Sequence, residues 1–94
     1  MLFMIIERYK NGDAGAVYRR FREHGRMMPE GLEYVASWVE SNFNRCFQVM
    51  SCDDPDLFQQ WTSHWDDLVD FEIVPLITSS EAAEQMISRS QDRN

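Results

Sequence analysis

The sequence predicts one α+β domain of the ferredoxin-like type, in which four antiparallel strands form a sheet and two helices cover one of its faces. Three observations support this prediction. Strand-like and helix-like segments follow one another in the order β-α-β-β-α-β over residues 1–80. Only a short turn separates the second and third strand-like segments, as in a hairpin. The last strand-like segment contains Pro75, which suits an edge strand, and this topology places that strand at an edge.

The first half of the chain is expected to form a strand, a helix and a hairpin. Residues 2–9 (LFMIIERY) are apolar and predict a strand that ends at the turn signal KNG. Asp13 suits the N-cap of a helix that runs to about His24, and Gly25 suits its left-handed end. Residues 32–40 alternate in character, and residues 45–51 (RCFQVMS) follow a turn-like segment, so together they predict a β-hairpin.

The second half is expected to add a helix, the last strand and a short tail. Residues 53–55 (DDP) predict the start of a helix that continues to about Leu68, and residues 70–78 (DFEIVPLIT) predict the last strand. Thr78 and Glu81 fit a capping box that opens a short helix to about Ser88. We therefore expect a single domain over residues 1–80, with a short C-terminal helix and a frayed tail over residues 81–94.

Composition narrows the class of protein. The chain has 94 residues, 44% of them hydrophobic, and a formal net charge of −7, which argues against a nucleic-acid or anionic-membrane partner. No apolar run approaches the roughly 18–20 residues that cross a bilayer. The first residues lack the basic and small-residue pattern of a signal peptide. A cytoplasmic protein is the expectation.

Several arginines lie on the first predicted helix and just after it. Arg19, Arg22 and Arg26 fall on the face opposite the apolar stripe, which is typical of a solvated helix face. A docking site for an acidic partner or an anion is the alternative. Cys46 and Cys52 would lie roughly 20 Å apart on one extended strand, too far for a disulfide, so free thiols are expected.

The stretch that most resembles a reactive site is FQQWTSHWDD at residues 58–67. The helical period places Trp61 and Trp65 in one apolar stripe, as expected of core residues. His64 falls on the flank of that stripe, with Asp67 as its i+3 neighbour, and is a weak candidate for proton transfer, as is Glu72. Histidines, cysteines and carboxylates show no metal-binding spacing, so neither a metal nor a cofactor is expected.

Packing predicts a homodimer. Two helices cover only one face of a sheet, yet the predicted strands carry apolar residues on both faces, so a second copy of the chain is the simplest cover for the other face. The helices are expected to cover the more uniformly apolar set, which is Val35, Val39, Phe47, Val49, Val74 and Leu76. The face away from the helices would then carry Tyr34, Trp38, Cys46, Gln48, Met50, Phe71, Ile73 and Ile77.

This second set is the candidate site. Aromatic and sulfur-containing residues with a few polar groups are typical of a small-molecule pocket, and they are equally typical of a dimer interface. The candidate ligand-binding residues are Tyr34, Trp38, Cys46, Gln48 and Met50.

Several short segments also resemble a known family. They are PEGL at residues 29–32 with Tyr34, SWV at 37–39, RCFQ at 45–48, Trp61 with Trp65, and LV at 68–69 with FE at 71–72. In order and spacing, over about residues 1–80, the chain resembles a family of small bacterial proteins of unknown function in the dimeric α+β barrel superfamily. The resemblance implies a ferredoxin-like fold and a dimer. It implies no activity, because relatives in the superfamily include cofactor-independent monooxygenases, haem-degrading enzymes and ligand binders.

Three functions follow as hypotheses. The first is a homodimer that binds a small apolar or aromatic molecule in a cavity between the sheet and the dimer partner. The second is a cofactor-independent monooxygenase- or isomerase-like enzyme that uses the same cavity, with His64, Cys46 or Glu72 in proton transfer. The third is an assembly or interaction protein without a ligand.

Overall fold

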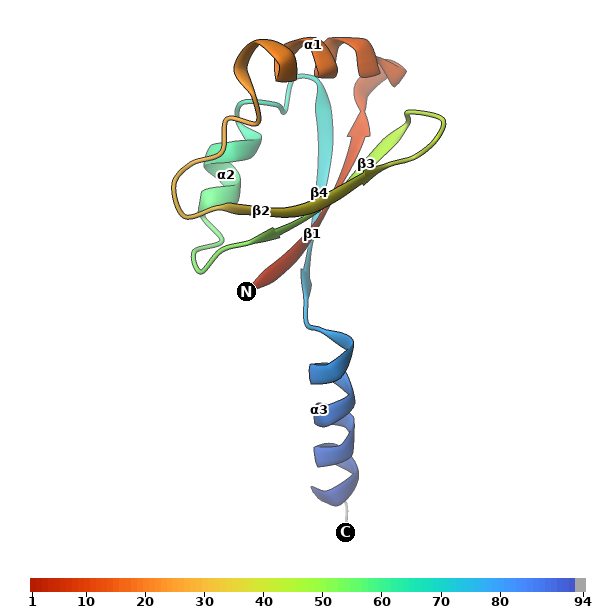
Figure 1. Ribbon diagram of the computed structural model, residues 1–94, viewed down its shortest axis with the longest axis vertical. Coiled ribbons are helices and arrows are strands. Elements are labelled where there is room, and N and C mark those ends of the chain that lie inside the picture. Colours follow the sequence, from red (N-terminus) through yellow and green to blue (C-terminus); the bar gives the residue numbers. More distant parts are fainter. Residues whose placement is uncertain (93–94) are drawn as a thin grey trace.

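A computed structural model describes residues 1–92 of the chain, and side chains of residues 1–90. The elements are the strands β1 (Leu2–Tyr9), β2 (Glu33–Val39), β3 (Arg45–Ser51) and β4 (Val69–Leu76), and the helices α1 (Ala14–His24), α2 (Leu57–Thr62) and α3 (Ser79–Asp92). A short 3-10 turn, Lys10–Gly12, joins β1 to α1. The protein is therefore an α+β domain whose elements before α3 follow the predicted order β-α-β-β-α-β. Figure 1 shows α1 and α2 beside the sheet and α3 extending away from it.

The sheet is antiparallel with the strand order β2-β3-β1-β4. This order is compatible with the ferredoxin-like prediction, and it confirms that β4, which contains Pro75, is an edge strand. The register pairs Ile5 with Gln48 on one side and with Ile73 on the other. On β2 the register shifts between Tyr34 and Ala36, which marks a β-bulge.

Local signals explain where the first helix begins and ends. The Asp13 side chain accepts a hydrogen bond from the Ala16 amide at 3.1 Å, which is the predicted N-cap. Gly25 has a φ of 68°, and its amide donates to the Phe21 carbonyl, so the left-handed end of the helix is also confirmed.

The second helix is shorter than expected. It ends at Thr62, and hydrogen-bonded turns continue the chain to Leu68. The predicted start at residues 53–55 is instead a turn in which the Asp54 side chain accepts from the Asp56 amide at 3.0 Å, so regular helix begins at Leu57.

The C-terminal helix opens as predicted and continues further than expected. The Thr78 hydroxyl accepts from the Glu81 amide at 3.1 Å, and the Glu81 carboxylate accepts from the Thr78 amide at 3.4 Å, which is the predicted capping box. The helix reaches Asp92 rather than about Ser88, so most of the tail expected to be frayed is helical. The rest of that expectation, residues 93–94, lies outside the described residues. Among residues 1–92, no helix has the length and apolar character of a bilayer span.

The core lies between one sheet face and the two helices. Phe3 packs edge-on against Phe58 of α2 at 4.9 Å between ring centroids, and Tyr9 packs against Tyr18 of α1 at 6.5 Å. Phe3 and Tyr9 lie on the same face of β1, because side chains alternate along a strand. Both helices therefore cover that face, and Trp61, Ile5 and Met50 are completely or almost completely buried in it.

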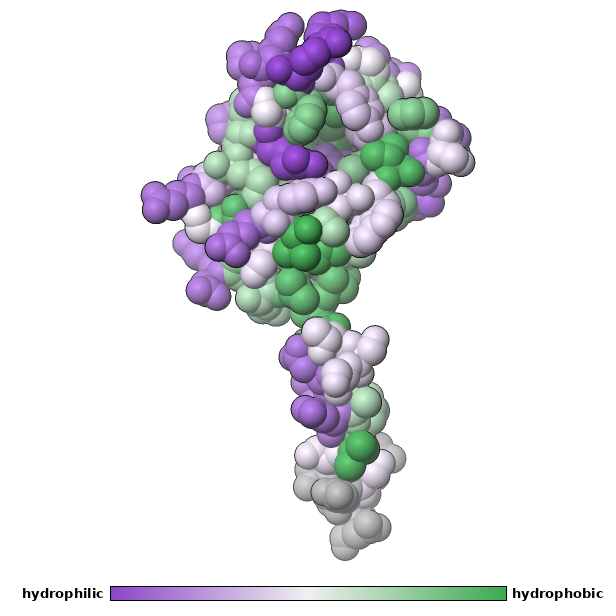
Figure 2. Space-filling model, viewed as in Figure 1, coloured by the Kyte–Doolittle hydropathy of each residue, from purple (hydrophilic) through white to green (hydrophobic). Residues whose placement is uncertain are grey.

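The opposite face carries no element of residues 1–92, and its side chains are mostly half-buried. Strand pairing assigns to it Leu2, Met4, Ile6, Ala36, Trp38, Phe47, Val49, Val74 and Leu76. We call these nine residues the open face. In Figure 2, hydrophobic residues gather on the body just before α3, whereas the surface around α1 is mostly hydrophilic.

The expected assignment of the two faces is wrong for β3 and β4. On β2 it is correct for Trp38, which lies on the open face, and for Val39, which faces the helices. Cys46, Gln48 and Met50 pair with Glu7, Ile5 and Phe3, so they face the helices. Phe71 and Ile73 do so as well, whereas four residues expected under the helices lie on the open face: Phe47, Val49, Val74 and Leu76. The sequence offers apolar residues on both sides of each central strand, so polarity alone favoured the wrong side.

Candidate functional site

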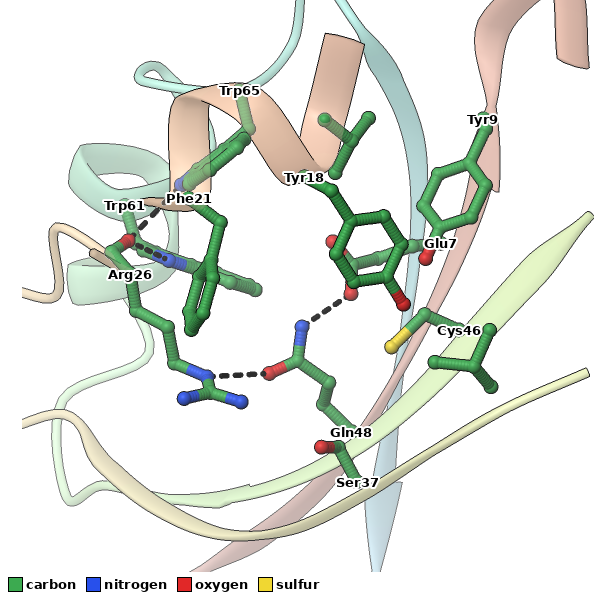
Figure 3. Close-up of a pocket in the computed structure, with 12 residues that line it drawn as sticks. Glu7, Tyr9, Tyr18, Phe21, Arg26, Ser37, Cys46, Gln48, Trp61 and Trp65 are labelled. Carbon is green, nitrogen blue, oxygen red and sulfur yellow. Dashed lines mark hydrogen bonds between the residues drawn. The ribbon is translucent and has the colours of Figure 1, made fainter. Parts of the chain in front are cut away.

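A cavity of about 240 Å³ lies between the helices and the covered sheet face. Twelve residues line it: Glu7, Tyr9, Val17, Tyr18, Phe21, Arg26, Ser37, Val39, Cys46, Gln48, Trp61 and Trp65. Figure 3 shows the rings of Tyr18 and Phe21 on the α1 side and those of the two tryptophans on the α2 side, with Glu7, Cys46 and Gln48 rising from the sheet. The wall is therefore mostly aromatic, and a few polar groups face one another within it.

The polar groups form a chain across the sheet. The Gln48 amide nitrogen donates a hydrogen bond to a carboxylate oxygen of Glu7, and the Gln48 amide oxygen accepts one from Nε of Arg26 at 3.4 Å. Glu7 and Gln48 are only 5% and 6% exposed. A buried carboxyl group needs such partners, because an unpaired polar group in an apolar setting costs several kcal/mol.

Burial sets the protonation of the groups around Glu7. It raises the pKa of the Glu7 carboxyl above its ordinary value, and the hydrogen bond from Gln48, the nearby Cys46 thiol and the charge of Arg26 oppose that rise only in part. Burial, together with the charge of Glu7, raises the pKa of the Cys46 thiol to about 12. Burial also raises the pKa of the Tyr9 hydroxyl well above its usual value. Burial around Glu7 therefore favours the neutral forms of these three groups, and the Glu7 carboxyl group can hold a proton closer to neutral pH than an exposed glutamate can.

Two tryptophans fix one side of the cavity. The indole nitrogens of Trp61 and Trp65 both donate to the Arg26 carbonyl oxygen, at 2.9 and 3.0 Å. Both side chains are almost fully buried, as the helical stripe predicted. Trp65 lies in the turn after α2 and not in the helix itself, and its side chain is still buried.

The predicted site residues separate into two groups. Cys46 and Gln48 line the cavity, and Tyr34 lies beside it, with its hydroxyl 2.7 Å from the hydroxyl of the lining residue Ser37. Met50 is fully buried in the core and does not line the cavity, and Trp38 is on the open face with 58% of its surface exposed. Tyr34 and Trp38 were expected on one face, and the bulge between Tyr34 and Ala36 separates them.

The two weak acid–base candidates lie away from the cavity. His64 is exposed in the turn after α2, and Glu72 pairs with Ile6 on the side of the open face. The i+3 spacing of His64 and Asp67 does not lead to a hydrogen bond between their side chains, and Asp67 instead accepts two hydrogen bonds from Arg20, at 2.6 and 2.8 Å. Arg20 also donates to the His64 backbone carbonyl, so this segment supports the fold.

The sequence reasoning missed Glu7 and placed Arg26 on the solvated face of α1. One signal pointed to Glu7, since it occupies a core position in the alternation Phe3, Ile5, Glu7, Tyr9, opposite a strand that carries Gln48. Arg26 follows the glycine that ends α1, so a helical wheel drawn through Arg19 and Arg22 misplaces it. Within residues 1–92, no three His, Cys, Asp or Glu side chains gather as metal ligands would.

Fold and site together define a small α+β domain with an aromatic-walled cavity between its sheet and helices. The family model described as "Domain of unknown function (DUF3303)" matches residues 1–89. The chain belongs to this family, whose domain therefore includes most of α3. No curated protein and no solved structure matches the chain.

Proposed function

We propose that the protein binds a small, mostly apolar or aromatic molecule in the cavity between the sheet and helices α1 and α2. The observation that supports this proposal is a void walled by aromatic rings with Glu7 and Gln48 exposed to it at its floor. An apolar cavity of about 150 Å³ can hold benzene. About 240 Å³ therefore leaves room for one ring with a small substituent. The site lies on the helix side of the sheet, not between the sheet and a dimer partner.

Phenol is a suitable first probe, because its ring suits the aromatic wall and its hydroxyl can donate to Glu7. The three indole N–H groups report its position by nuclear magnetic resonance: Trp61 and Trp65 line the cavity, whereas Trp38 is on the opposite sheet face. We expect phenol to shift the first two signals in a saturable way and to leave the third unchanged. A shift of all three alike, or of none, would contradict the proposal and favour an assembly protein without a ligand.

A matched pair of variants localises the binding. Ser37→Phe places a ring in the cavity from β2, whereas Ser41→Phe makes the same change in the exposed turn after β2. We expect the first variant to abolish phenol binding and the second to retain it. Equal affinity in both would show that phenol binds elsewhere.

An enzyme that moves protons is a second candidate function, and Glu7 is the observation that favours it. Its carboxyl group lies in the cavity with a raised pKa, as a general acid or base acting near neutral pH requires. Acetophenone carries exchangeable carbon-bound hydrogens beside its carbonyl group and tests this activity in deuterium oxide. Faster exchange with the wild-type protein than with Glu7→Gln is expected of an isomerase-like enzyme. Bound acetophenone that exchanges no faster than in buffer would remove this candidate.

We also propose that the open face is covered by a second copy of the chain. This face is roughly 20 Å by 25 Å from the strand spacing and rise, or about 500 Å². A standard interface buries about 800 Å² on each partner, so the open face needs an additional surface. Helix α3 offers one, because Met86 and Ile87 are 56% and 60% exposed on a helix that extends from the body. A 14-residue helix is marginal in water without such packing.

Light scattering after size-exclusion chromatography tests the dimer. Trp38→Asp introduces a charge on the open face, and Phe43→Asp makes a matched change at a similarly exposed aromatic residue in the β2–β3 turn. We expect a wild-type dimer that Trp38→Asp dissociates and Phe43→Asp preserves. A wild-type protein that stays monomeric at roughly 100 μM, about a hundred times a micromolar dissociation constant, would contradict the proposal.

A further inference from the structure

The Arg26 guanidinium is the one cavity group with a formal positive charge among the twelve that line it. Three described arginines are half-buried, and two of them pair with acids: Arg20 with Asp67 and Arg45 with Glu40, both at 2.6 Å. Arg26 has no carboxylate within ion-pair distance among the side chains of residues 1–90. Its only side-chain hydrogen bond within that part of the chain is from Nε to Gln48. The terminal nitrogens are therefore available to a ligand.

Aromatic rings hold this guanidinium in place. Its carbon lies 3.9 Å from the centroid of the Tyr34 ring and 5.1 Å from that of Phe21. Stacking of this kind leaves the in-plane N–H groups free to donate. Figure 3 shows the guanidinium at one side of the cavity. Its Nε points toward Gln48, and its two terminal nitrogens point away from Gln48.

The backbone at Arg26 is equally constrained. Its carbonyl oxygen accepts from both cavity tryptophans, and the residues on either side, Gly25 and Met27, have left-handed φ values of 68° and 57°. A left-handed methionine is a costly conformation that the surrounding contacts must maintain. Such strain is commonly found where a side chain must be placed accurately. Arg26 is thus oriented before any ligand arrives.

A fixed, unpaired guanidinium recognises a carboxylate through two parallel N–H···O bonds. We infer that the cavity binds a small aromatic monocarboxylate, with its ring against the aromatic wall and its carboxylate on the terminal nitrogens of Arg26. This inference rests on the proposed function and adds the charge of the ligand to it. A protein with a net charge of −7 repels anions in general. The positive charge of Arg26 is the local feature of the cavity that can attract one.

Benzoate and benzamide test the inference, because they have nearly the same shape and differ in charge. Affinities are measured at low salt from the Trp61 and Trp65 indole signals, with Trp38 as the internal reference. We expect the wild-type protein to bind benzoate at least about tenfold more tightly than benzamide. Arg26→Met should weaken the binding of benzoate far more than that of benzamide, so that the preference disappears. Arg22→Met makes the same change at an exposed arginine outside the cavity, and it should retain the preference.

The outcomes separate this inference from the proposed function. Equal affinity of the wild-type protein for benzoate and benzamide, or a preference that survives in Arg26→Met, overturns the inference and leaves a cavity for neutral rings. Binding of neither compound, nor of phenol, overturns the proposed function itself. Arg26→Lys covers the case in which Arg26→Met does not fold. It retains the charge but not the paired N–H geometry, so we expect an intermediate preference, and an unchanged preference counts against carboxylate recognition by Arg26.

Discussion

The shared acceptor at Arg26 leads to a quantitative prediction. Trp61→Phe and Trp65→Phe each retain a ring in the core but remove one of the two N–H groups that donate to the Arg26 carbonyl. A lost hydrogen bond costs about 0.5–1.5 kcal/mol, and the smaller ring adds a packing loss, so each variant should destabilise by about 1–3 kcal/mol. In either variant the carbonyl retains one donor.

The double variant should cost more than the two single variants together. With both donors gone, the half-buried carbonyl has no protein partner, which adds about 1–3 kcal/mol. We therefore expect a coupling of about 1 kcal/mol or more between the two sites.

Urea unfolding, followed by far-ultraviolet circular dichroism at one fixed protein concentration, measures the four free energies of unfolding. Phe43→Leu is the control, because its side chain is 55% exposed in the β2–β3 turn and lies off the open face, and a change within about 0.5 kcal/mol is expected. Costs that add to within about 0.5 kcal/mol would refute the shared-acceptor reasoning.

Three further substitutions have predictable effects on stability. Because burial raises the folded-state pKa of Glu7, its contribution to stability is complete below the unfolded pKa and is lost as the pH rises through the folded one. Glu7→Gln should therefore gain stability relative to the wild type as the pH rises above about 4.5 in urea titrations. A difference independent of pH would contradict this. Asp13→Ala removes the cap of α1 and should cost about 1 kcal/mol by the same assay, whereas no loss would show the cap to be dispensable. Gly31→Ala should lower the melting temperature, because φ is 94° and a Cβ would lie 3.1 Å from Leu57, and an unchanged melting temperature would contradict that reading.

Local sequence signals were sufficient for the element order. The Asp13 cap, the Gly25 end, the Thr78–Glu81 box and the edge position of Pro75 are each set by residues close in sequence. The two tryptophans were also correctly assigned to the core, because their four-residue spacing keeps them on one face even where regular helix gives way to turns.

The orientation of the sheet faces could not be predicted in the same way. In β1, Leu2, Met4 and Ile6 are as apolar as Phe3 and Ile5, so periodicity alone does not say which set meets the helices. The covered face contains Glu7 and Gln48, which are buried together and hydrogen-bond each other, and two such polar residues make that face resemble an exposed one in the sequence.

The bulge on β2 and the reversal at Arg26 concealed the rest of the site. A one-residue shift after Tyr34 moves Trp38 to the other face, and no residue type in YVASWV marks that shift. Arg26 reaches the cavity only because Gly25 and Met27 both adopt left-handed conformations, and a methionine gives no sequence signal for one.

The reactivity of the Cys46 thiol can report motion at the floor of the cavity. With a pKa of about 12, only about one thiol in a hundred thousand is ionised at pH 7, and the side chain is 8% exposed. An alkylating reagent therefore reacts only as fast as local motion exposes the sulfur to solvent and hydrates it. In a Cys52→Ser background, the labelling rate of this single thiol therefore measures how often the sheet floor of the cavity is exposed to solvent.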